Sequence, residues 1–134
     1  MLYALDTNTI IFILKSDNGV CDILNKKFLH NKIAMPPVVY YETLRGLMDN
    51  NAAKKIEKFE EFYSGLFFPV ISEKDVMKKA ADIYINLKKC GKTVADNDII
   101  IAAWSIVAHG ILVTENTKHF VDIDGLLIEN WKKR

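Results

Sequence analysis

The sequence has 134 residues, half of them hydrophobic, and a formal net charge of +1. This length suits one compact domain and is too short for two ordinary ones, so we expect a single domain over residues 1–134. The near-neutral charge removes the argument for nucleic-acid binding that a strongly basic chain would provide, and partners have to be inferred from local groups.

The sequence lacks the motifs that are typical of several classes of protein. Cys21 and Cys90 form no CxxC pattern and have no histidine at zinc-binding spacing, so we expect two reduced thiols, as in a cytoplasmic protein. The apolar run at residues 10–14 has neither the length of a membrane span nor the flanks of a signal peptide, so no membrane association is expected. The sequence patterns of a P-loop, a Rossmann dinucleotide site and a serine hydrolase do not occur.

The chain begins with a short apolar run at residues 2–5 that stops at Asp6 and small polar residues. Such a run is consistent with a central strand of a parallel sheet. Ligands of open α/β sheets bind at the carboxyl ends of the strands, where this interpretation places Asp6. Aspartate is also a favoured N-cap residue, so Asp6 could equally serve only to cap a helix that begins near Thr7.

The rest of the chain alternates helical and strand patterns. Apolar periodicity and capping signals predict helices at residues 9–15, 17–31, 38–48, 52–65, 73–90 and 96–109. Short apolar runs predict further strands at residues 33–35, 67–71, 111–114 and 126–128. Strands separated by helices favour the α/β class, with a mostly parallel sheet of about five strands covered by helices on both faces.

Acidic residues stand out on two of the predicted helices. Glu42 has mostly apolar neighbours, and it is either functional or the partner of Arg45 in an ion pair one turn away. Asp96 and Asp98 open the helix that is apolar nearly all round. Asp96 as N-cap and Asp98 in the first turn would both be favoured there, yet such a cluster of acids also suits a divalent cation.

The end of the predicted strand at residues 111–114 supplies a further candidate, because Asn116 lands at the same sheet edge as the first strand's end. Four positions could therefore converge on one pocket: Asp6, Glu42, Asp98 and Asn116. Hard cations such as Mg²⁺ prefer carboxylate, amide and water oxygens, and one or two of them could activate a water for attack on phosphate. The histidines match no metal-binding pattern, so we interpret them as surface or capping residues: His30, His109 and His119.

Five segments carry a family resemblance in their order along the chain. They are Leu5-Asp6-Thr7-Asn8, Tyr41-Glu42-Thr43-Leu44-Arg45-Gly46, Asp98-Ile99-Ile100-Ile101-Ala102-Ala103, Val113-Thr114-Glu115-Asn116 with His119-Phe120, and Gly125-Leu126-Leu127-Ile128-Glu129-Asn130-Trp131. This ordered set resembles the PIN-domain ribonucleases, and specifically the VapC-like toxins of type II toxin-antitoxin systems. The resemblance spans the whole chain and implies a PIN-like three-layer α/β/α sandwich.

The resemblance also implies a chemistry. It makes the chain an endoribonuclease in which Asp6, Glu42 and Asp98 hold Mg²⁺ or Mn²⁺ for hydrolysis of RNA, without a covalent intermediate. Many members have a fourth acid where this chain has Asn116, so one and two metals both remain open. Asn116 would then be a neutral ligand or orient water, and Asp96 would take over part of the charge.

Neighbouring polar residues and partners follow from the same resemblance. Residues that would position the acids are Thr7, Asn8, Thr114 and Glu115. Such proteins are commonly homodimers that a small antitoxin protein neutralises, so the implied partners are RNA, an antitoxin and a second copy of the chain. Lys88, Lys89 and Lys92 could contact RNA phosphates, or they could simply form a solvated helix end that the helix dipole favours.

Two alternative functions remain. Asp6 could be the nucleophile of a phosphoryl-transfer enzyme, although residues 6–10 lack the second aspartate and the following threonine of an Asp-x-Asp-x-Thr motif. The chain could instead be a PIN-like RNA- or partner-binding module with weak catalysis, as the missing fourth acid suggests. Three intact carboxylates argue against that module, because unneutralised buried acids cost stability unless something binds them.

Overall fold

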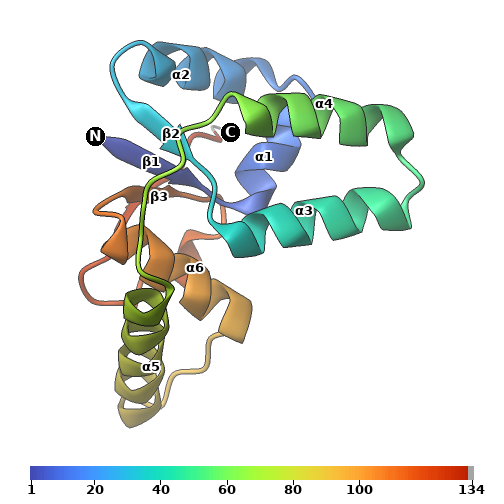
Figure 1. Ribbon diagram of the computed structural model, residues 1–134. Helices are drawn as coiled ribbons and strands as arrows, with labels where there is room; N and C mark the ends of the chain where they lie inside the picture. The colour runs from blue at the N-terminus through green and yellow to red at the C-terminus, as the bar shows by residue number, and fades with distance from the viewer. Residues whose placement is uncertain (133–134) are drawn as a thin grey trace.

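The centre of the molecule is a parallel β-sheet (Figure 1), seen in a computed structural model that describes residues 1–132. Within those residues the strands are β1 (Leu2–Leu5), β2 (Lys32–Ala34), β3 (Ile111–Val113) and β4 (Leu127–Glu129). They pair in the order β2-β1-β3-β4, and all three pairings are parallel. The predicted α/β class and parallel sheet are confirmed, but the described sheet has four strands rather than about five.

The strand predicted at residues 67–71 is wrong, because this segment has no regular secondary structure. Its first residue pairs with β2 in the way that a neighbouring strand would, because the Phe67 N–H donates to the Ile33 carbonyl at 2.8 Å. In a strand the next N–H on that side belongs two residues later, and this position is Pro69, which has no N–H to donate. Of the apolar side chains in this segment only Ile71 packs against the core, whereas Phe67, Phe68 and Val70 are exposed.

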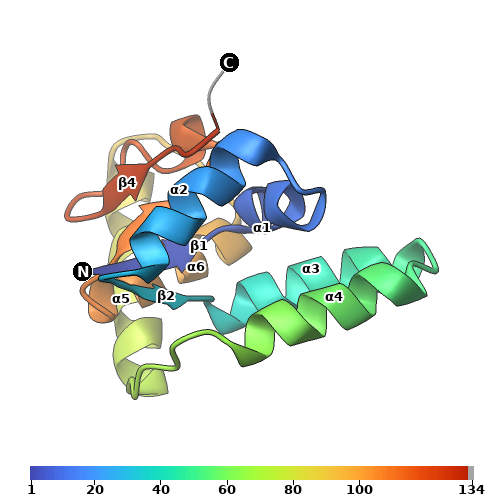
Figure 2. The ribbon, with the colours of Figure 1, turned by 90° about the horizontal axis from the view of Figure 1, so that it is seen from above.

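Helices surround the sheet (Figures 1 and 2). In order they are α1 (Thr7–Leu14), α2 (Asn18–Phe28), α3 (Pro37–Asp49), α4 (Ala53–Ser64), α5 (Glu73–Lys89) and α6 (Asp96–Val107), and a short 3₁₀ turn η1 (Thr117–His119) follows β3. In Figure 1, α2 lies above the sheet and α5 and α6 lie below it, while α3 and α4 form a hairpin that projects to one side. Each predicted helix is present with small shifts at its ends, and the layers agree with the expected sandwich.

Burial explains why the central segments are so apolar. Every residue of β1 and β3 is buried, as expected for parallel strands covered on both faces. Helix α6 packs against both α5 and β3, and its residues Ile101, Ala102 and Ala103 are fully buried. None of the helices in residues 1–132 is long and apolar enough to cross a membrane.

Candidate active site

Asp6 follows directly on β1, and only 5% of it is exposed. Its N–H donates to the Val113 carbonyl at 2.9 Å, which fixes its backbone beside the end of β3. One carboxylate oxygen accepts from the Thr7 N–H and the other from the Thr114 hydroxyl, both at 2.8 Å. Asp6 is therefore the N-cap of α1 and also a carboxylate at the predicted sheet edge, and its role in binding a ligand stays a prediction.

Glu42 projects from α3 toward the same edge. Its Oε1 accepts from the Thr7 hydroxyl at 3.0 Å and its Oε2 from the Asn97 amide at 3.3 Å. The alternative ion pair with Arg45 is wrong for the described residues, since Arg45 instead lies over the Tyr41 ring and donates to the Tyr41 hydroxyl at 3.2 Å. Glu42 thus links α3 to the starts of α1 and α6.

Asp98 lies in the first turn of α6, where the positive end of the helix dipole favours an acid. Its Oδ2 is 3.2 Å from His119 Nδ1. The N-cap of this helix is Ala95, whose backbone is extended, so the prediction of Asp96 as N-cap is wrong. Asp96 is the first helical residue and its side chain is exposed, which leaves a share in metal binding as a prediction.

The charges of neighbouring acids affect the pKa values of Asp6 and Asp98. Burial is the main reason that the pKa of Asp6 is raised; hydrogen bonds from Thr114 and Thr7 oppose the rise, and the negative charges of Asp98 and Glu42 add to it. Burial likewise raises the pKa of Asp98, with His119 opposing and Glu42 adding to the rise. The structure therefore brings Asp6, Glu42 and Asp98 into one site from three separate elements.

A hydrogen-bond network joins α1 to the loop after β3. The Thr114 hydroxyl, which donates to Asp6, accepts from the Asn116 N–H at 3.0 Å and from the Asn8 amide at 3.4 Å. Asn8 Oδ1 accepts in turn from the Glu115 N–H at 3.0 Å. Asn116 and Glu115 thus enter the network through backbone groups; the Asn116 side chain is exposed, and its role as a ligand stays a prediction.

Two site residues were missed by sequence reasoning. Asn97, which the sequence pattern does not single out, donates its side-chain amide to Glu42. His119 was interpreted as a surface or capping residue; it is exposed, but it contacts Asp98. The sequence did contain a signal for His119. This histidine lies one short turn after Asn116, just beyond the end of the predicted strand.

The carboxylate oxygens of Asp6, Glu42 and Asp98 are ligands that suit Mg²⁺ or Mn²⁺. No ion pair within residues 1–132 involves Asp6 or Glu42, so their charge is not neutralised by lysine or arginine. In the same residues, no three acidic, histidine or cysteine side chains are close enough to form a ready-made ligand shell. Mg²⁺ usually keeps several waters and takes one or two carboxylates, so an open cluster fits a hydrated ion better than a closed protein cage.

A groove of about 370 Å³ adjoins the acids. Thr7 and Glu42 line it together with apolar side chains of α1 and α3, and Lys15 and Lys55 contribute positive charge. An extended chain lying in this groove would reach Glu42 directly.

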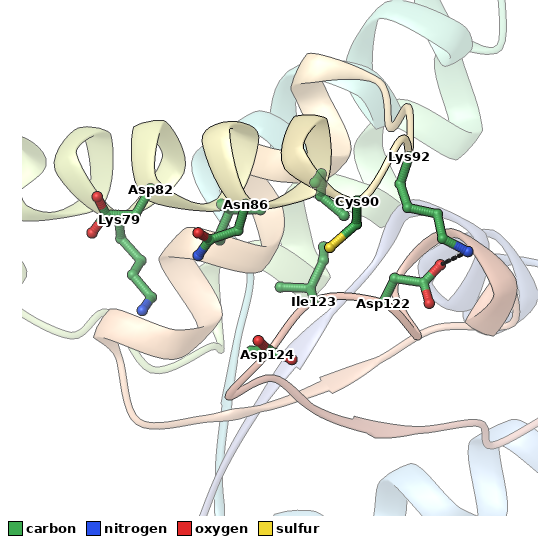
Figure 3. Close-up of a pocket in the computed structure, with 10 residues that line it drawn as sticks. Lys79, Asp82, Asn86, Cys90, Lys92, Asp122, Ile123 and Asp124 are labelled. Carbon is green, nitrogen blue, oxygen red and sulfur yellow. Dashed lines mark ion pairs between the residues drawn. The ribbon is translucent and has the colours of Figure 1, made fainter.

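A second cleft, of about 200 Å³, lies between α5 and the loop before β4 (Figure 3). Here lysines accompany the acids: Lys79 and Asp82 share the lining, and Lys92 Nζ is 3.5 Å from Asp122. The charge of Lys92 is thus partly paired within the protein, while Lys88 and Lys89 are exposed in the last turn of α5. Contact of these three lysines with RNA stays a prediction.

Comparison with known proteins agrees with this fold. Residues 3–126 match the family model described as PIN domain. The chain belongs to the PIN domain family. This PIN-domain protein is 29% identical to Ribonuclease VapC2 of Rickettsia felis, with 99% of this chain and 100% of that protein aligned. It is 30% identical to Ribonuclease VapC2 of Haemophilus influenzae, over 96% of this chain and 97% of that protein.

A solved structure supports the same assignment. The crystal structure of VapBC2 from Rickettsia felis bound to a DNA fragment from their promoter superposes with a TM-score of 0.90 at 27% sequence identity, and the match covers 98% of this chain and 100% of that chain. The resemblance to the VapC-like PIN-domain proteins that the sequence motifs indicated is thereby confirmed.

Proposed function

We propose that this PIN-domain protein is a Mg²⁺- or Mn²⁺-dependent endoribonuclease that hydrolyses phosphodiester bonds of RNA. The observation that carries the proposal is the meeting of Asp6, Glu42 and Asp98 at one sheet edge, where Thr7 donates to both Asp6 and Glu42 and the charge of Glu42 raises the pKa of both aspartates. The relatives named as VapC ribonucleases, which align over nearly the whole chain, support it.

In this proposal Asp6, Glu42 and Asp98 hold the cation. When bound, the ion supplies Lewis acidity, which makes water a better nucleophile and neutralises charge that develops on the phosphate. The protein's own groups fix the acids: Thr7 and Thr114 stabilise the ionised form of Asp6 despite its burial, and Asn97 holds Glu42. The water loses a proton as its oxygen bonds to phosphorus, a bond from phosphorus to a ribose oxygen breaks, and that ribose oxygen gains a proton to leave as a hydroxyl.

The partners are proposed by likeness. The solved relative is a VapBC complex, so we assign to this chain a small antitoxin protein as partner. The groove beside Glu42 gives an extended segment of RNA or of protein access to the acids. A homodimer is proposed from the family resemblance alone.

Cleavage of a mixed structured RNA pool tests the function. The purified protein should cut RNA with Mg²⁺ or Mn²⁺ and stop in EDTA. Asp98→Asn should lower the rate by at least about 100-fold, the upper end for loss of a group that only supports a metal ligand. Asp82→Asn, a matched change in the second cleft on α5, should cut at the wild-type rate.

Two results would contradict the assignment: cutting that survives EDTA, or an Asp98→Asn variant as active as the wild type. A folded wild-type protein that neither cuts RNA nor binds Mn²⁺ would support the alternative of an RNA- or partner-binding module.

A further inference from the structure

We propose that His119 positions Asp98 for cation binding through a hydrogen bond from its Nδ1–H. The inference rests on the proposed function, because it concerns the same cluster of acids, and it adds a residue from outside the predicted metal-binding set. His119 comes from the loop after β3, whereas Asp98 opens α6, so the contact joins two separate parts of the site.

The geometry of the contact decides which group donates. His119 Nδ1 lies 3.2 Å from Asp98 Oδ2. An ionised carboxylate can only accept hydrogen bonds, so the ring proton must be on Nδ1. The bond uses one carboxylate oxygen and leaves Oδ1 for a cation. Rotation of an aspartate carboxylate about its last torsion is broad and weakly restrained, so one fixed donor is enough to select an orientation.

The loop is built to hold His119 in place. Phe120, the next residue, is fully buried and fixes the end of the turn in the core. Within the turn, the His119 N–H donates to the Asn116 carbonyl at 3.0 Å and the Phe120 N–H to the Thr117 carbonyl at 3.1 Å. The exposed imidazole is therefore carried by an anchored backbone.

The same loop serves a second acid. Its first residue, Thr114, donates to Asp6, and its last turn presents His119 to Asp98. A single segment of six residues thus orients two carboxylates, one directly after β1 and one in the first turn of α6. Glu42 has its own donors on other elements, so each acid has at least one dedicated hydrogen-bond donor.

Stability does not account for the pair. The His119 side chain is 58% exposed and that of Asp98 22% exposed, and ion pairs in such exposed positions contribute little to folding. Partners that orient metal-binding side chains, by contrast, typically change metal affinity or activity by about 10- to 100-fold when they are removed. A positioning role therefore predicts a large effect on cation binding and a small one on folding.

Calorimetric titration with Mn²⁺ alone tests the inference on four full-length proteins. His119→Leu removes the donor and should weaken Mn²⁺ binding by about 10- to 100-fold. His119→Asn places an amide N–H near the position of Nδ1 and should bind Mn²⁺ within about 3-fold of the wild type, since the donor is kept. The melting temperature of each variant without metal should match that of the wild type.

His109→Asn is the matched control. His109 follows the far end of α6 with a φ of 55°, a backbone conformation that asparagine tolerates, and it should leave Mn²⁺ binding unchanged. Mn²⁺ binding by His119→Leu equal to that of the wild type would overturn the inference and leave the proposed function intact. Mn²⁺ binding that is weakened equally in His119→Asn and His119→Leu would also overturn the inference and leave the proposed function intact. A wild-type protein that binds no Mn²⁺ would overturn both the inference and the proposed function.

Discussion

Two buried threonines near the acids differ in what their hydroxyls contact. Thr114 is fully buried, and its hydroxyl donates to Asp6 and accepts from two amide groups. Thr43, beside Glu42 on α3, is 1% exposed, and its hydroxyl has no hydrogen-bond partner among residues 1–132. The two side chains have the same shape and similar burial, so a comparison between them isolates the value of the hydrogen bonds.

Valine at each position removes the hydroxyl and keeps the shape. Thr114→Val should lower the free energy of unfolding by about 1–3 kcal/mol, because it leaves buried partners unsatisfied. Thr43→Val should raise it by about 1 kcal/mol, because an unpaired buried hydroxyl is removed. Urea unfolding at neutral pH measures both values. Equal losses in the two variants would contradict this account of the network.

At the scale of residues, the sequence position of the acids was enough to predict that they belong to the site. It was not enough to predict all of the residues that hydrogen-bond to them. Asp6 and Asp98 were found because a strand end and a helix start are local patterns. Asn97 and His119 were missed as partners because the groups they bind, Glu42 and Asp98, lie 55 and 21 residues away in sequence. No local pattern encodes a contact over such a separation, so it appears only in the folded structure.

At the scale of elements, the passage from α6 into β3 depends on Gly110. A Cβ atom at this position would lie 2.6 Å from Leu2 Cδ2 and 3.2 Å from the Leu2 carbonyl oxygen. The first contact would force the buried Leu2 side chain to move, and the second would require a small shift of the Leu2 backbone. The missing side chain therefore lets the segment after α6 approach β1, the strand that leads into Asp6.

Gly110→Ala should lower the free energy of unfolding by about 1–3 kcal/mol, the usual cost of overpacking. The control is Gly46→Ala within α3, where a Cβ atom would meet nothing within 4 Å. That change should raise the free energy of unfolding by about 0.5–1 kcal/mol, because alanine favours the helix. Thermal and urea unfolding of the pair give the comparison; a Gly110→Ala protein as stable as the wild type would contradict the proposed close approach.

The elements themselves were largely predictable. Helix positions followed from apolar periodicity, and the strands of the sheet from short buried runs. The exception at residues 67–71 looked like a strand by composition, yet Pro69 prevents continued pairing with β2. The start of α6 was misjudged by one residue because Ala95, which carries no capping side chain, occupies the N-cap where Asp96 was expected.

At the scale of the whole molecule, the fold gathers negative charge that no lysine or arginine among residues 1–132 neutralises. The strand order places β1 beside β3, so the ends of these two strands meet, and α3 and α6 add Glu42 and Asp98. A raised pKa at Asp6 and at Asp98 means that the ionised forms are disfavoured in the folded protein without a cation. Binding of a divalent ion would stabilise the ionised carboxylates, and it would thereby complete the proposed active site.

The most direct test is to locate Mn²⁺ by anomalous diffraction from crystals grown with MnCl₂. The account predicts a strong anomalous peak among the carboxylates of Asp6, Glu42 and Asp98. A peak only in the cleft between α5 and the loop before β4 (Figure 3), or no peak at all in crystals that hold ample Mn²⁺, would contradict it.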